Sequence, residues 1–369
     1  MKNVFDKLQV IIVSAVLLTV SVLIFIIPDK TFSENENRSL ETAPKLSAET
    51  MASGEFTETL GRYLADQFPF RDTFVSVKAY GELLSGKKEN NGVIYCEGDT
   101  LVPRTDINPD RLYDNLKCIS DFSKRTGAEV TVAALPRVAD VYLELLPVGY
   151  PKDIDRDIWK NYADAAKALR VNTADVYDVL CESNSYYRTD HHYTTDGAFK
   201  TYEILASVLG FEPFDIDYFK ISRVTESFCG TSMRTSGFYF AEKDEIYLYR
   251  YPSDDRYKIV ADGEEIELYD MEKLDTTDKY AVFLGGNHAR VDIALESEDR
   301  EKLLVIRDSF ADSIAPFLAL HYDLTLIDLR YYTDSVSRCV REEGIDKVLV
   351  LENISELVTA KNLTYLRME

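Results

Sequence analysis

The sequence predicts an α/β fold in which helices flank a parallel sheet, with one transmembrane helix before the domain and a β-rich insertion inside it. Three features support this prediction: an unbroken apolar run at 8–27, alternating helix and strand patterns at 107–179, and the return of that alternation at 303–352. Alternating helices and strands are typical of a parallel sheet with helical crossovers. The roughly 340 residues beyond the apolar run could form one large domain or two smaller ones, and we expect one domain with an insertion.

The apolar run at 8–27 contains no charged residue. It is long enough to cross a bilayer core, which takes about 20 residues of helix. Lys2 and Lys7 precede the run and Asp29 follows it, so the positive charge places the N-terminus in the cytoplasm. Because no small-residue cleavage site follows, we expect residues 1–28 to form a retained signal anchor, with the rest of the chain outside the cell membrane. A cleaved signal peptide is the alternative.

Residues 29–55 are rich in Ser, Glu and Thr and lack apolar periodicity, which predicts a polar tether. We therefore expect the domain at 56–369. It opens with a helical pattern at 56–86 that a Phe-Pro-Phe-Arg turn at 68–71 interrupts, and a hairpin pattern follows at 92–104.

The α/β pattern comes in two blocks. The first has helices at about 107–126 and 154–169 and strands at about 129–136 and 173–179. The second has strands at 303–306, 324–329 and 346–352, with helices from about 310 and near 334–343. Between the blocks, at about 213–300, short Tyr-rich segments alternate in polarity and are separated by Asp, Gly and Ser, which predicts the β-rich insertion.

The charge balance limits the partners of the protein. The chain has 42 Lys and Arg against 64 Asp and Glu, a formal net charge of −22. A charge this negative argues against nucleic acid, polyanionic polymers or anionic lipid surfaces as the main partner. It favours a neutral or positively charged substrate.

The cysteines show neither CxxC pairs nor the spacing of a metal finger. The five are Cys96, Cys118, Cys181, Cys229 and Cys339. An odd number cannot pair completely within one chain, and a large apolar core does not need disulfides. We expect mostly or wholly free thiols, as in many exported proteins of Gram-positive bacteria.

Two of the four histidines, His191 and His192, are adjacent and follow Asp190 directly. On an extended segment, a carboxylate two residues before an imidazole lies on the same face and can orient the ring. Asp190 and His192 would then form the orienting half of a catalytic triad. The alternative is a surface loop whose histidines only cap the helix that starts at 195.

Ser309 is the candidate nucleophile. It follows the buried strand pattern at 303–306 and precedes a helix, so its hydroxyl lies on a tight turn near backbone N–H groups that can receive an oxyanion. The alternative is that Asp308 or Ser309 is an ordinary helix N-cap. Ser313, one helical turn further on, is a weaker candidate.

Several motifs in order resemble one known family. They are FPFRD at 68–72, TDHHYTTDGAF at 189–199, GTSMRTSG at 230–237, GGNHARV at 285–291, IRDSFADSIAPFLALHY at 306–322 and DLRYY at 328–332. Together they are similar to the DHHW family, which resembles the SGNH-like O-acetyltransferases that modify alginate and cellulose outside the cytoplasm. The resemblance implies an SGNH-hydrolase-like fold.

The resemblance also implies roles for individual residues. Asp190 and His192 match the Asp-x-His pair, and Ser309 matches the nucleophile. Arg307 replaces the Gly of the usual Gly-Asp-Ser block, and Tyr193 stands where the family name has Trp. The His pair precedes the Ser, as in the alginate branch.

Five further positions are candidates for binding substrate or an oxyanion. Arg330 resembles an active-site arginine of the acetyltransferases, and a surface salt bridge is its alternative. Asn353 stands where SGNH enzymes often keep an oxyanion-hole Asn, with Asn287 as a competing candidate or an ordinary turn residue. His191 and Tyr193, on either side of His192, complete the set.

We therefore expect serine-dependent O-acetyl transfer to, or removal from, a cell-surface or secreted polysaccharide, with no cofactor and no metal. Acetyl-CoA is cytosolic, so the resemblance implies a membrane-bound O-acyltransferase partner as donor. One alternative is a non-catalytic carbohydrate-binding protein on the same fold. Another is a metal-dependent phosphoesterase, which would need more Asp or His ligands than His288 and His321 supply.

Overall fold

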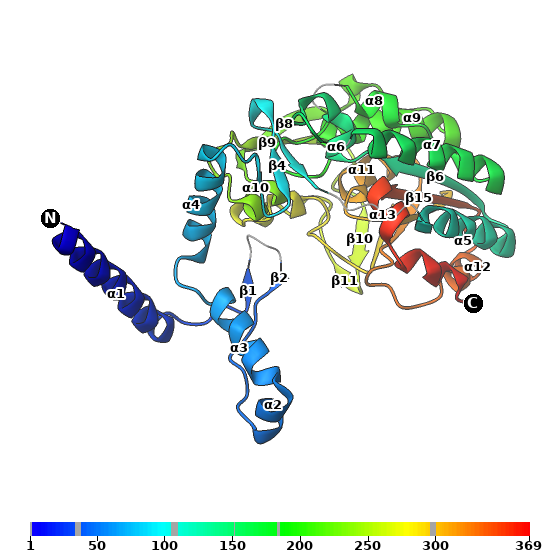
Figure 1. The fold of residues 1–369 in the computed structure, drawn as a ribbon. Coiled ribbons are helices and arrows are strands. Elements are labelled where there is room, and N and C mark those ends of the chain that lie inside the picture. The colour runs from blue at the N-terminus through cyan, green and yellow to red at the C-terminus, as the bar shows by residue number, and fades with distance from the viewer. Residues whose placement is uncertain (1, 34–37, 105–109, 151, 183–184, 296–299) are drawn as a thin grey trace. The chain divides into compact units, whose positions relative to one another are not determined.

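The computed structural model describes residues 2–33, 38–104, 110–150, 152–182, 185–295 and 300–369 (Figure 1). The chain divides into two compact units. One contains residues 1–91 and 234–239, and the other contains 92–233 and 240–369.

The first unit begins with α1 (Lys2–Ile26). The segment Lys7–Ile24 has a mean hydropathy of 2.3, and none of it is buried. By length and composition α1 can cross a membrane, which fits a signal anchor or a signal peptide.

Local structure follows α1 where composition predicted only a polar tether. β1 (Phe32–Ser33) pairs with β2 (Arg38–Ser39), and α2 (Ala48–Ser53) precedes α3 (Glu55–Asp66). The backbone N–H of Lys30 donates to Gln67 Oε1 at 3.0 Å, and that of Glu41 donates to Asp66 Oδ2 at 2.9 Å. Such bonds require no apolar periodicity, so the sequence pattern could not reveal them.

The predicted break at 68–71 is confirmed. α3 ends at Asp66 and α4 (Arg71–Leu84) begins after Phe70, whose φ of 59° lies in the left-handed region. Pro69 cannot donate a helical hydrogen bond, which explains the interruption. β3 (Glu89–Asn90) closes the continuous part of this unit.

The second unit is built on an eight-stranded sheet in the order β11-β10-β12-β14-β13-β15-β6-β7. Five strands at one end run parallel: β14 (Asp323–Ile327), β13 (Lys302–Arg307), β15 (Lys347–Asn353), β6 (Glu129–Leu135) and β7 (Asn172–Thr173). Three strands of the insertion are antiparallel: β10 (Lys258–Ala261), β11 (Glu264–Glu265) and β12 (Arg290–Ala294).

The sheet is therefore mixed and largely parallel: the predicted parallel sheet is confirmed in five strands, and the antiparallel strands of the insertion extend it. β12 pairs with the free edge of β14, so the insertion lengthens the main sheet. The segment at 173–179 also differs from its prediction. Its strand ends at Thr173, and α8 (Tyr177–Leu180) follows.

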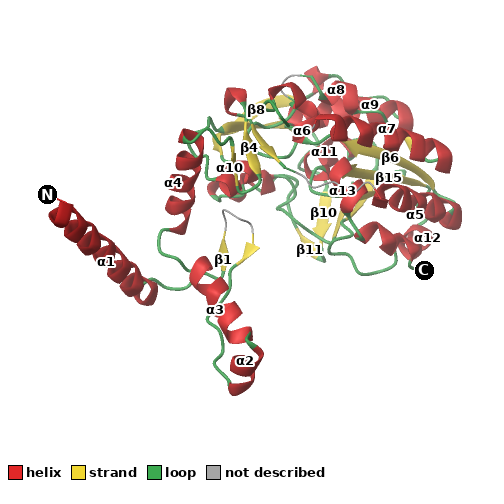
Figure 2. Cartoon of the chain, viewed as in Figure 1, coloured by secondary structure: helices red, strands yellow, loops and turns green. Residues whose placement is uncertain are grey.

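Helices lie on both faces of the parallel strands (Figure 2). α5 (Asp110–Thr126), α7 (Lys152–Leu169), α12 (Val336–Glu343) and α13 (Ile354–Thr359) share one core with Leu304 and Ile306. α9 (Thr195–Leu209) and α11 (Ala311–Leu318) share the other core with Leu303 and Val305. Successive strand residues face opposite sides, and each fully buried aliphatic side chain stabilises the fold by about 1.5–3 kcal/mol.

The smaller elements complete the chain. The predicted hairpin is confirmed as β4 (Val93–Tyr95) and β5 (Leu101–Pro103), and the insertion adds the pair β8 (Lys220–Phe228) and β9 (Asp244–Arg250). The short helices α6 (Val138–Val141) and α10 (Thr231–Ser236) lie in the connections. All five cysteines are free, as expected.

Candidate active site

Ser309 lies on the turn between β13 and α11. Asp308 fixes this turn, because its carboxylate accepts hydrogen bonds from the backbone N–H of Phe310 at 3.0 Å and of Asn353 at 2.7 Å. The hydroxyl of Ser309 does not cap the helix. The residue at the start of α11 is Phe310, which makes no side-chain cap.

Asp190 and His192 lie on the loop that leads into α9. Thr194 is the N-cap of α9 and accepts from the backbone N–H of Gly197 at 3.2 Å, so the histidines have no capping role. The loop bends at 188–192 instead of extending, which corrects the geometry assumed from the spacing. Asp190 Oδ1 accepts from the backbone N–H of His192 at 3.0 Å, and Oδ2 accepts from that of Thr231 at 2.6 Å.

The structure brings the three predicted triad residues into one hydrogen-bonded chain. His192 Nδ1 is 2.5 Å from Asp190 Oδ1, and His192 Nε2 is 2.7 Å from Ser309 Oγ. Asp190 and His192 are buried, whereas Ser309 is partly exposed. With Nδ1–H donated to the carboxylate, Nε2 is free to accept the serine proton.

Charge keeps Asp190 ionised despite its burial. Burial alone would raise its pKa, but His191, His192 and the backbone N–H of Thr231 hold the pKa well below its usual value of 3.8. An ionised carboxylate can orient His192 and stabilise the imidazolium that forms when Ser309 loses its proton.

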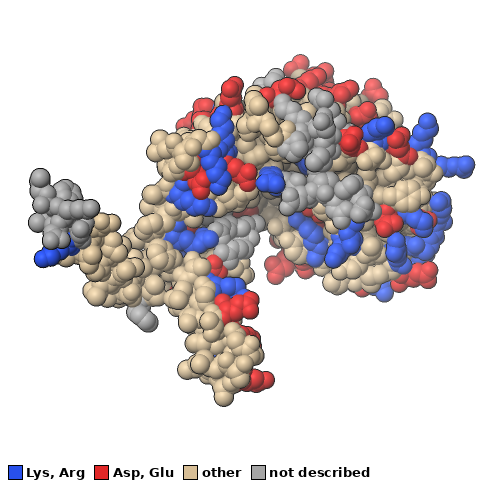
Figure 3. All heavy atoms as spheres, in the orientation of Figure 1, with Lys and Arg blue, Asp and Glu red and all other residues tan. Residues whose placement is uncertain are grey.

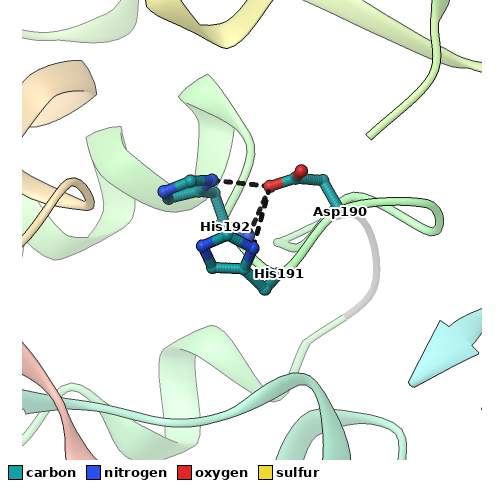
Figure 4. A group of neighbouring side chains, drawn as sticks. All are labelled: Asp190, His191 and His192. Atoms are coloured by element: carbon teal, nitrogen blue, oxygen red, sulfur yellow. Dashed lines mark hydrogen bonds and ion pairs between the residues drawn. The ribbon is translucent and has the colours of Figure 1, made fainter. Parts of the chain in front are cut away.

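His191 lies beside the triad without completing it (Figure 4). Its Nδ1 is 3.7 Å from Asp190 Oδ1, its ring centroid is 4.0 Å from that of His192, and 41% of its side chain is exposed. Asp190, His191 and His192 are also the one group with metal-ligand spacing in the described part of the chain. The short Asp190–His192 hydrogen bond engages Oδ1 of Asp190 and Nδ1 of His192.

Two tyrosines pack around the nucleophile turn. Tyr193 is fully buried and donates to the carbonyl oxygen of Phe310 at 2.7 Å. This hydrogen bond helps to hold the nucleophile turn in place. Tyr280, which the sequence analysis missed, stacks on His192 with ring centroids 3.9 Å apart and 10° between planes. Its hydroxyl lies 3.3 Å from the carbonyl oxygen of Ser309 and 3.0 Å from Ser313 Oγ. Ser313 is buried against Tyr280.

Arg307, at the position of the usual Gly, is buried and lies 2.7 Å from Asp312 Oδ1. This ion pair joins the end of β13 to the first turn of α11, and its two residues flank Ser309 in the chain. Burial raises the pKa of Asp312 to about 7, although Arg307 and His192 oppose the shift.

The three other predicted substrate or oxyanion candidates are Arg330, Asn353 and Asn287. Arg330 is held by the buried Asp328, with Nη2 at 2.6 Å from Oδ2, so the salt-bridge alternative is observed. Asn353 caps α13 through Oδ1 and donates from Nδ2 to the carbonyl oxygen of Pro136 at 3.0 Å. Asn287 is exposed and follows two glycines of positive φ, as in an ordinary turn. Their oxyanion or substrate roles stay predictions.

Comparisons with known proteins agree with this architecture. Residues 158–327 match the family described as DHHW protein. A DHHW family protein from Eubacterium siraeum is 19% identical with a TM-score of 0.62, and the match covers 76% of this chain and 96% of that one. PatB1 from Bacillus cereus is 18% identical with a TM-score of 0.63, covering 74% and 99%.

One further solved structure is more distant. The O-acetyltransferase domain of AlgJ from Pseudomonas putida is 14% identical with a TM-score of 0.49, and the match covers 75% of this chain and 98% of that domain. No curated protein matches the chain. The likeness to PatB1 and to the Eubacterium siraeum protein shows the fold, a mixed and largely parallel sheet flanked by helices.

Proposed function

We propose that this protein, whose residues 158–327 match the DHHW family, is an extracytoplasmic enzyme that uses Ser309 to transfer an acetyl group to or from a hydroxyl of a cell-surface polysaccharide. The observation that carries the proposal is the hydrogen-bonded chain from Asp190 through His192 to Ser309. A non-catalytic binding protein has no need for these contacts.

The geometry supports a two-step acyl transfer. In the first step, His192 Nε2 takes the Ser309 proton as Oγ attacks the acyl carbonyl carbon. The tetrahedral intermediate then expels the donor's alcohol group, which receives that proton from His192, and an acetyl ester remains on Ser309. In the second step, a sugar hydroxyl or water gives its proton to His192 and attacks the ester. Collapse releases the product and returns the proton to Ser309.

The oxyanion of each intermediate needs hydrogen-bond donors. Within the described residues, the backbone N–H of Ser309 donates no hydrogen bond and lies at the nucleophile turn. It is our first candidate donor, and the amides of Asn353 or Asn287 are candidates for the second. Removing one such donor typically slows an acyl transfer by about 10²–10³-fold.

The charge of the whole chain supports a neutral acceptor. The net charge of −22 disfavours a polyanionic polymer. Figure 3 shows both acidic and basic side chains on the second unit, with acidic ones frequent along its upper edge. With α1 as a single-pass anchor and its N-terminus in the cytoplasm, the domain lies outside, and a membrane-bound O-acyltransferase supplies the acetyl group.

Hydrolysis of p-nitrophenyl acetate by the full-length protein in detergent tests the proposal. Ser309→Ala should lower kcat/KM by about a thousandfold, the scale of losing one triad member. Ser207→Ala, on an exposed face of α9, is the matched control and should keep full activity. Full activity in Ser309→Ala would contradict the nucleophile assignment.

A further inference from the structure

A cleft apart from the candidate active site lies between α7 and the segment that follows β7. It has a volume of about 400 Å³. Trp159, Tyr162 and Lys167 of α7 line it on one side, and Asp175, Tyr177 and Asp178 line it on the other. We call it the α7 cleft. None of its lining residues belongs to the triad.

Aromatic rings form the walls of the α7 cleft. The rings of Trp159 and Tyr177 are 4.7 Å apart at 63°, and those of Trp159 and Tyr162 are 6.0 Å apart at 82°. The indole N–H of Trp159 is shielded from solvent and has no acceptor among the described residues. A shielded donor without an acceptor is unfavourable unless an oxygen from outside the chain supplies one.

The rim of the cleft carries both signs of charge. Asp175 and Asp178 are exposed acceptors, and Lys167 is an exposed donor. Two carboxylates against one ammonium group make the rim negative, which disfavours phosphate or carboxylate ligands. Flat rings beside carboxylates suit an uncharged ring that has a C–H face for the aromatics and hydroxyls for the polar groups.

The cleft lies on the same edge of the sheet as the triad. Residues 174–178 follow β7, and Ser309 follows β13, so both lie beyond the carboxyl ends of parallel strands. Ala134 of β6 lines the cleft two residues before Pro136, which is about 7 Å along a strand. The carbonyl oxygen of Pro136 accepts from Asn353 Nδ2 at 3.0 Å, next to the nucleophile turn.

We propose that the α7 cleft binds an uncharged pyranose unit of the polysaccharide. That this unit belongs to the chain acetylated at Ser309 rests on the proposed function, whereas binding itself does not. The rings of Trp159 and Tyr177 pack against the sugar's C–H face, and Asp175 and Asp178 accept from its hydroxyls.

Trp159 is the single tryptophan of the chain, so selective tryptophan excitation reports on this cleft alone. The full-length protein in detergent is titrated with N,N′,N″-triacetylchitotriose, with cellotriose and with trigalacturonate. The first two differ in their acetamido groups, and the third carries a carboxylate on every ring. We expect a saturable change in emission with one or both neutral trisaccharides and none with trigalacturonate.

Variants then assign the signal to the cleft. Asp175→Asn with Asp178→Asn replaces two charge-assisted hydrogen bonds by neutral ones and should weaken binding about tenfold or more. Asp164→Asn, an exposed aspartate of α7 outside the cleft, should leave the affinity unchanged. No saturable change with either neutral sugar, equal binding of trigalacturonate, or unchanged affinity in the double variant would each overturn the proposal.

The experiments distinguish a wrong cleft proposal from a wrong proposed function. Ser309→Ala should keep the emission change while losing ester hydrolysis. The Asp175 and Asp178 double variant should keep hydrolysis of p-nitrophenyl acetate, which does not need a polysaccharide subsite. Hydrolysis that depends on Ser309 without any emission change would overturn the cleft alone.

Discussion

Tyr280 stacks face to face on His192, with 3.9 Å between ring centroids and 10° between planes. The stack and the hydroxyl contacts of Tyr280 limit the positions that the imidazole and the nucleophile turn can adopt. Tyr280 is thus a positioning residue in the proposed mechanism.

Replacing Tyr280 should reduce catalysis more than binding. Tyr280→Leu removes the stack and should lower kcat for p-nitrophenyl acetate by about 10–100-fold, because small misplacements of a catalytic group are costly. Tyr280→Phe keeps the stack and should recover most of that loss. Steady-state kinetics with a thermal melt of each variant provides the check. A loss confined to KM, or equal losses in both variants, would argue against a positioning role for the ring.

The two histidines should differ sharply. His192→Ala removes the base that contacts Ser309 Oγ at 2.7 Å, so kcat/KM should fall by about a thousandfold or more. His191→Ala should have little effect, because its ring lies outside the Asp190–His192–Ser309 chain. Asp190→Ala should lower kcat/KM somewhat less than His192→Ala does, because the carboxylate exchanges no proton. If His191→Ala is the more damaging change, the base has been misassigned.

Gly230 allows the backbone to pass close to the catalytic carboxylate. A Cβ at this position would overlap Cβ of Asp190 and the carbonyl oxygen of Thr189. We expect Gly230→Ala to displace Asp190 and lower activity at least about tenfold. Gly81→Ala in α4 is the control, because a Cβ there meets nothing within 4 Å and alanine favours helix. Equal activity in both variants would show that the loop can yield without moving Asp190.

Asp312 should make the protein less stable as pH rises toward neutrality. Burial raises its folded-state pKa to about 7 from an ordinary 3.8, so the folded chain keeps a proton that the unfolded chain releases. This contribution to stability is complete below about pH 4 and is lost as pH rises to about 7. Urea titrations at several pH values in that range give the free energy of unfolding. It should fall less steeply with rising pH in Asp312→Asn than in the unmodified protein. Asp164→Asn should keep the original slope, and an unchanged slope in Asp312→Asn would contradict the assignment.

The sequence predicted the central strands well because each is a continuous buried apolar run, as in the segment Lys302–Arg307. It could not predict that β10, β11 and β12 would extend this sheet in the antiparallel direction. Edge pairing depends on backbone hydrogen bonds, and the side-chain pattern of the Tyr-rich insertion looks the same whether it forms a separate sheet or joins the main one.

The candidate site was likewise predicted from the sequence only in part. Asp190, His192 and Ser309 stood out because their residue types can form a triad and because the motifs around them resemble those of a known family. The bend that joins Asp190 to His192 was not predicted, since a two-residue spacing fits either a strand or a turn. Tyr280 had no local signal at all, because it is one of 24 tyrosines and meets His192 only through the tertiary fold.

The most direct test of the account is the site and rate of sulfonylation. A sulfonyl fluoride modifies an activated serine hydroxyl, so it labels the nucleophile that the triad would activate. The full-length protein is treated with methanesulfonyl fluoride and mapped by peptide mass spectrometry. We predict a single adduct on Ser309 that forms at least about a hundredfold more slowly in His192→Ala. An adduct on another residue, or an unchanged rate in His192→Ala, would contradict the claim that His192 activates Ser309.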